Sequence, residues 1–107
     1  MIKILLRGEC IKKKTDIAER IYEAVIGMYA NKADYVVEGI AVDDEFESGK
    51  ECDKNYEIVY NAKNRLHEIL SDSAYDDVEV IHQRLNQITH DVAIKMFVYG
   101  VKFGSKK

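Results

Sequence analysis

The three histidines are the side chains best suited to acid–base or metal chemistry, and their spacing does not assemble a site. His82 and His90 stand eight residues apart, so on a helix they are about 80° apart around the axis and two turns apart along it. His67 is followed by Glu68, but the second histidine of a zinc-protease motif is missing, and the sequence contains no CxxC pair. We therefore expect no metal site and interpret the histidines as solvent-facing or helix-end residues.

Other catalytic arrangements are equally incomplete. The dipeptide His90-Asp91 occurs among the ligands of HD-type phosphohydrolases, but those enzymes need further histidines and aspartates from several helices. No serine lies in a nucleophile elbow, and no glycine-rich loop follows a strand in a way that could hold phosphate. We expect no catalytic residue, no cofactor and no enzymatic activity.

The composition and the cysteines indicate one folded domain. The chain has 107 residues, of which 47% are hydrophobic and 33% are charged, as is usual for folded proteins. Cys10 and Cys52 are interpreted as reduced thiols, with Cys52 as a small core residue. We predict a single helical domain over residues 1–107.

The sequence shows no membrane or export signal. Its longest uncharged apolar run is far shorter than the roughly 20 residues that span a bilayer. The apolar run at 2–6 precedes Lys12, Lys13 and Lys14, whereas a secretory signal begins with its basic residues. We expect a cytoplasmic protein without membrane contact.

The last third of the chain, residues 76–104, predicts a long helix around which the other elements are arranged. Apolar residues recur there in steps of three and four, which is the period of one helix face. They are Ile81, Leu85, Ile88, Val92, Met96, Tyr99 and Phe103. A second apolar face begins after Val92 and consists of Ile94, Phe97, Val98 and Val101. We expect a core helix that is covered on two sides, by the first helix or by another subunit.

The remaining elements are predicted from caps and composition. A first helix begins at Thr15 or Asp16 and ends at Asn31, and a second covers 51–70. Residues 71–75 form the connection to the last helix, with Ser73 as its cap. Residues 35–42 are strand-prone and could pair with residues 2–6. The predicted fold is mainly α: three helices with a long C-terminal core helix, and a minor two-stranded β ribbon from residues 2–6 and 35–42.

Two short segments are candidates for binding a partner. The net charge is −3, but residues 34–53 are strongly acidic while both ends of the chain are basic. Phe46 lies within the acidic run and is either a plug into the core or a contact residue. Gly100 and Gly104 lie four apart, so they either permit close helix packing or end the helix. The candidate partner-binding residues are Asp43, Asp44, Glu45, Phe46, Glu47, Tyr99, Gly100 and Phe103.

The segment from Phe97 to Gly104 resembles the end of an uncharacterised family of short helical proteins. That family is found in Gram-positive bacteria, their phages and mobile elements, and its last helix ends close to F-x-x-G-F-[RK]-L-G. Phe97, Gly100, Lys102 and Gly104 fit this pattern, while Val101 and Phe103 are hydrophobic substitutions. The resemblance covers at most the second half of the chain. It implies a helical fold and no established activity.

Three functional hypotheses remain open from the sequence. The first is a small cytosolic domain that acts by binding another protein, with a homodimer as one form of that interaction. The second is a phage-encoded, anti-CRISPR-like inhibitor whose acidic segment 34–53 mimics the phosphates of nucleic acid. The third is nucleic-acid binding through the basic termini, which the net acidic charge argues against. Without a binding function, the acidic segment is interpreted as a solvated surface loop.

Overall fold

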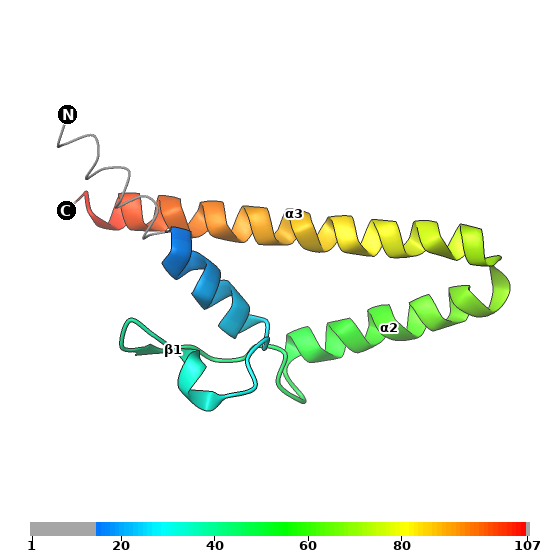
Figure 1. Cartoon of the computed structure of the whole chain (residues 1–107), viewed down its shortest axis with the longest axis horizontal. Coiled ribbons are helices and arrows are strands. Elements are labelled where there is room, and N and C mark those ends of the chain that lie inside the picture. Colours follow the sequence, from blue (N-terminus) through cyan, green and yellow to red (C-terminus); the bar gives the residue numbers. More distant parts are fainter. Residues whose placement is uncertain (1–14, 107) are drawn as a thin grey trace.

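The computed structural model describes residues 15–106, which form a mainly helical, open triangle (Figure 1). A first helix covers 15–25, followed by the 3₁₀ helix η1 (Lys32–Tyr35) and the strands β1 (Val36–Val37) and β2 (Ile40–Ala41). The helices α2 (Glu51–Ile69) and α3 (Asp72–Gly104) complete the chain. Within the described residues, the prediction of three helices, a long C-terminal helix and a small two-stranded sheet is confirmed.

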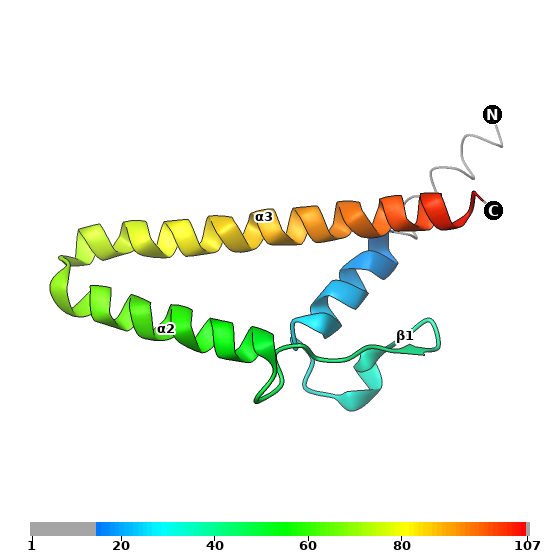
Figure 2. The ribbon, with the colours of Figure 1, turned by 180° about the vertical axis from the view of Figure 1, so that it is seen from behind.

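The helices form a frame rather than a closed bundle. The helices α2 and α3 form a splayed hairpin, and the first helix crosses from the C-terminal half of α3 toward the start of α2 (Figures 1 and 2). The radius of gyration is 18.1 Å, whereas a compact domain of this length has about 13 Å. The 33 residues of α3 correspond to about 50 Å of helix, and the longest dimension of the molecule is 59 Å. The chain is therefore extended along α3.

The turn between α2 and α3 is tighter than predicted. The helix α3 begins at Asp72, because Ser71 caps it by accepting a hydrogen bond from the Ala74 N–H at 3.3 Å. The predicted connection 71–75 and the predicted cap Ser73 are therefore wrong. Only two residues, 70 and 71, join the helices, which constrains them to run antiparallel.

The first helix ends at residue 25, six residues before the predicted stop at Asn31. Gly27 adopts a φ of +74°, and the Met28 N–H donates to the Glu23 carbonyl at 2.9 Å. This is the usual way in which a left-handed glycine ends a helix. Asn31 instead caps η1, where its side chain accepts a hydrogen bond from the Ala33 N–H at 3.1 Å.

The sheet is a tight hairpin inside the predicted strand segment 35–42. Strand β1 pairs antiparallel with β2, and Val37 lies opposite Ile40. Both turn residues, Glu38 and Gly39, have positive φ, as the common two-residue hairpin turn requires. The strand prediction for 35–42 is confirmed, and its pairing partner is the same segment. Residues 2–6, the predicted second strand, lie outside the described residues.

Very little of the described chain is fully buried. The buried hydrophobic residues are Ala18, Ala24 and Val37. The row of residues that the sequence places in the core, from Ile81 to Phe103 along α3, is largely exposed. Within the described residues only one apolar face of α3 is covered, and cover of the other face by another subunit stays a prediction.

Gly27 provides a test of how the first helix is joined to the loop that follows β2. A Cβ at Gly27 would lie 2.5 Å from the Asp44 carboxylate, which accepts a hydrogen bond from the Phe46 N–H at 2.8 Å. We expect Gly27→Ala to destabilise the chain by at least about 1 kcal/mol more than Gly39→Ala, because it adds a collision and endangers that hydrogen bond. Gly39 is a matched control: its φ is +79° and nothing lies within 4 Å of its Cβ position. Equal losses in urea unfolding at one protein concentration would show that Asp44 does not hold the loop tightly against the first helix.

Candidate functional site

The principal candidate site is a bare apolar row on α3, which we call the α3 stripe. It consists of Ile81, Leu85, Ile88, Val92, Met96, Tyr99 and Phe103. At 100° per residue these side chains fall within a sector about 80° wide. Each is between 49% and 69% exposed. The α3 stripe is thus a continuous, solvent-facing apolar surface along about six turns of helix.

The opposite face of α3 is covered by the first helix. Ile94, Phe97, Val98 and Val101 lie on this face and are half-buried, in contrast to the α3 stripe. Thr15 and Glu19 of the first helix line a depression together with Ile94 and Val98 of α3, and Tyr22 of the first helix meets His90. The second apolar face predicted after Val92 is therefore the one that packs within the chain.

His90 fixes the first helix to α3. Its Nε2 lies 2.8 Å from both carboxylate oxygens of Glu19, and its Nδ1 lies 3.1 Å from Asp91 Oδ1. The edge of its ring meets Tyr22 with centroids 4.9 Å apart. The hydrogen bonds to Glu19 and then to Asp91 raise the pKa of His90 above 6.5. In turn, the His90 and Gln87 hydrogen bonds hold the pKa of Asp91 below 3.8.

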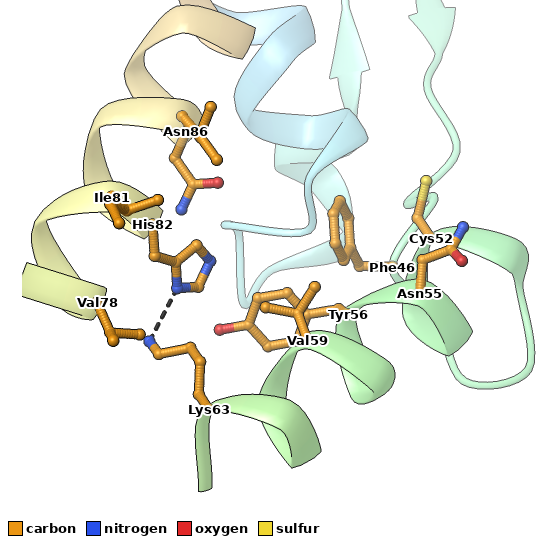
Figure 3. A pocket seen from close by; sticks show the side chains of 11 residues that line it. Phe46, Cys52, Asn55, Tyr56, Val59, Lys63, Val78, Ile81, His82 and Asn86 are labelled. Carbon is orange, nitrogen blue, oxygen red and sulfur yellow. Dashed lines mark hydrogen bonds between the residues drawn. The ribbon is translucent and has the colours of Figure 1, made fainter. Parts of the chain in front are cut away.

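An apolar groove of about 440 Å³ lies between α2 and α3 (Figure 3). Val59 and Tyr56 of α2 face Val78, Ile81 and Leu85 of α3 across it. Ile81 and Leu85 also begin the α3 stripe, so the groove and the stripe form one continuous surface.

Polar contacts hold the groove open at a fixed width. Lys63 of α2 lies 2.9 Å from the Glu79 carboxylate and 2.9 Å from His82 Nδ1, both on α3. The hydrogen bond to Lys63, and then that to Tyr75, lowers the pKa of Glu79. His67 stacks on Tyr75 with ring centroids 4.0 Å apart. All of these side chains make contacts between α2 and α3.

The acidic candidates are divided between internal contacts and solvent. Phe46 is half-buried, lines the groove and meets Tyr56 edge to face at 6.2 Å. Asp44 accepts a hydrogen bond from the Phe46 N–H, and its carbonyl accepts one from Lys50 Nζ at 2.9 Å. Glu47 lies 3.7 Å from Lys50, while Asp43 and Glu45 are exposed. The Glu45 N–H donates to the Val25 carbonyl at 2.8 Å, which ties this loop to the first helix.

The second predicted group lies at the far end of α3. Tyr99 and Phe103 line a small depression with Lys102 and Lys106, and Lys102 Nζ lies 5.3 Å from the centre of the Tyr99 ring. Gly100 is exposed and nothing lies within 4 Å of its Cβ position. Figures 1 and 2 both show this end of α3 well apart from the acidic loop. Within one chain, the two predicted groups are therefore not brought together.

Sequence reasoning places two features in the core that the structure places at the surface. Cys52 is exposed beside the groove, so its interpretation as a small core residue is wrong. The α3 stripe resembles a core face in the sequence because periodicity reports which residues share a face and does not report what covers it. The lengths carry a further signal: the 33 residues of α3 exceed the 19 of α2, so α2 cannot cover α3 over its full length.

The described residues, 15–106, offer no set of three histidine, cysteine or acidic side chains that could hold a metal ion. Among the same residues, no helix is sufficiently long and apolar to span a membrane. The nucleic-acid hypothesis combines residues at both ends of the chain. Lys3, Arg7 and Lys12 to Lys14 lie outside the described residues, and the tail lysines Lys95, Lys102 and Lys106 are exposed.

No family model, curated protein or solved structure matches the chain. The resemblance of residues 97–104 to the Gram-positive and phage family accordingly stays a prediction.

The contact between His90 and Glu19 predicts a pH-dependent stability. A raised histidine pKa means that the folded state favours charged His90, so its contribution is complete below pH 6.5 and is lost as the pH rises through the raised value. We expect the stability advantage of the wild type over His90→Gln to decrease as the pH rises from 6.5 through the raised pKa of His90. Asp91 does not interfere, because its contribution is lost only as the pH falls through its lowered pKa.

The measurement is urea unfolding at a series of pH values. His67→Gln is the matched control, since His67 stacks on Tyr75 and is not placed between two carboxylates. A wild-type advantage over His90→Gln that is constant or increases with pH would show that the charged form of His90 does not hold the first helix on α3.

Proposed function

We propose that this chain is a protein-interaction domain that binds through the α3 stripe and works as a homodimer. The observation that carries the proposal is the exposure of seven large apolar side chains in one row, on a helix whose opposite face is already packed. Monomeric soluble proteins rarely expose a continuous apolar patch of more than a few hundred Å², and larger patches mark binding sites.

The size of the α3 stripe supports a second copy as the occupant. Seven large side chains, each about half exposed or more, offer roughly 700 Å² of surface, and a standard interface buries about 800 Å² on each partner. A symmetric dimer buries the same patch twice, so the stripe alone approaches the size of a stable contact. The enrichment of aromatic side chains and methionine at its C-terminal end is also typical of interfaces.

The small intramolecular core supports the same proposal. Side chains such as Leu85 and Ile88 each gain about 1.5–3 kcal/mol when they leave water completely. Within the chain they obtain less than half of this, because they stay more than half exposed. Association is the step in which that free energy becomes available.

A charge at the centre of the α3 stripe tests the proposal. We expect Val92→Lys to weaken self-association at least tenfold, about 1.4 kcal/mol, because the lysine would be buried against an apolar partner. Helix content at low concentration should be retained, since the Val92 side chain is 56% exposed within one chain. Light scattering after size exclusion, over a range of concentrations, measures the association, and circular dichroism measures the helix content.

Gln83→Lys is the matched control for this experiment. It adds the same charge to the same helix at an exposed position, about half a turn away from the centre of the α3 stripe. It should leave the association unchanged. A wild type that is monomeric at every concentration, or a Val92→Lys variant that associates as well as Gln83→Lys, would reject the proposed function.

A further inference from the structure

We infer that α3 pairs with α3 of a second copy in antiparallel orientation, with a two-fold axis at Val92. In this arrangement, Tyr99 and Phe103 of each copy enter the groove between α2 and α3 of the other. The inference rests on the proposed function, since it specifies how the α3 stripe is occupied. It is carried by the spacing of the stripe, the position of the groove and the charge along α3.

The spacing of the α3 stripe is the same in both directions. From Ile81 to Phe103 the steps are 4, 3, 4, 4, 3 and 4, so the row is symmetric about Val92. An antiparallel copy centred on Val92 therefore places every apolar residue against another apolar residue. The resulting pairs are Ile81 with Phe103, Leu85 with Tyr99, Ile88 with Met96, and Val92 with its own copy.

The same spacing keeps the two helices in contact over their full length. Two units of eleven residues correspond to about 3.67 residues per turn, close to the 3.6 of a straight α-helix. The row consequently drifts little around α3, and the helices need only slight supercoiling to stay in register. A row with a strict seven-residue repeat would instead demand a left-handed supercoil.

The groove lies where this pairing places the bulkiest side chains. Ile81 and Leu85 form part of its α3 wall, and their antiparallel counterparts are Phe103 and Tyr99. Phe103 is 69% exposed and Tyr99 is 49% exposed at the other end of the helix. A groove of about 440 Å³ lies within the range of about 300–1,000 Å³ that is usual for binding pockets. The C-terminal end of the α3 stripe thus supplies exposed aromatic side chains, and the N-terminal end supplies an apolar groove that can take them up.

The charge along α3 also favours the antiparallel orientation. Its first two turns contain Asp72, Asp76 and Asp77, and its end carries Lys102 and Lys106. In the antiparallel register centred on Val92 the counterpart of Asp77 is position 107, so Asp77 lies near Lys106 of the second copy at each end, and the two helix dipoles oppose each other. A parallel pair would place each acidic end beside its own copy, set Phe103 against Phe103 and leave the groove empty.

Cysteine pairs distinguish these arrangements directly. In a chain with Cys10→Ser and Cys52→Ser, Val92→Cys is expected to form an oxidised dimer by itself. Leu85→Cys alone and Tyr99→Cys alone should form no oxidised dimer. In the antiparallel pair the two copies of residue 85 lie about 21 Å apart along the helix, and so do the two copies of residue 99. Mixed together, these two variants should form a disulfide-linked dimer. Ile88→Cys with Met96→Cys is a second pair by the same rule, should either of the first two variants lose its helix content.

The outcomes separate this inference from the proposed function. Oxidised dimers of Leu85→Cys alone and of Tyr99→Cys alone would show a parallel pair, which overturns the inference and leaves the α3 stripe as the interface. A dimer by light scattering that forms no disulfide at any of these positions would overturn both. A monomer at every concentration would also overturn both, including the case in which another segment of the same chain occupies the α3 stripe.

Discussion

The cost of leaving the α3 stripe in water is the constraint on which this structure depends. A helix that carries apolar side chains on two faces needs cover on both, because each large side chain gives up about 1.5–3 kcal/mol if it stays exposed. The first helix covers one face of α3, which consists of Ile94, Phe97, Val98 and Val101. The other face stays open over about six turns. The described residues form an extended frame with a splayed hairpin and an apolar groove, and they leave this face exposed.

Polar contacts, rather than a large core, set the geometry that presents this face. His90 and Glu19 hold the first helix on one side of α3, and Lys63 with Glu79 spans the hairpin. Such partly exposed ion pairs contribute modestly to stability, so their main effect here is to fix orientation. Phe46, tied by the turn at Asp44, forms the floor of the groove at the start of α2. These contacts orient the frame so that its apolar side stays exposed.

The sequence predicts the helices of this protein much better than it predicts what covers them. The limits of α2 are correct to one residue and the strand segment 35–42 is found, because apolar spacing and strand-prone residues act locally. The end of the first helix is missed, because Asn31 is an acceptable stop and the left-handed Gly27 is a stronger one. The capping residue of α3 is Ser71 rather than Ser73, a choice between two equally suitable hydroxyls.

The candidate site illustrates the same limit. Tyr99 and Phe103 are candidates from the sequence, and they form the end of the exposed row. The remaining residues of the α3 stripe read as core, since a repeating apolar face looks the same whether the chain or a partner covers it. Phe46 and Tyr56 meet at the side of the groove, in a tertiary contact that spacing along the chain does not encode.

The most direct test of the central claim is the thermal unfolding midpoint of the purified chain as a function of its own concentration. If the α3 stripe is covered by a second copy, folding and association are linked, and the midpoint must rise steadily as the concentration increases. A midpoint that stays constant over roughly a hundredfold range of concentration would mean that one chain alone provides all the stabilising contacts. That result would contradict the claim that a second copy covers the α3 stripe.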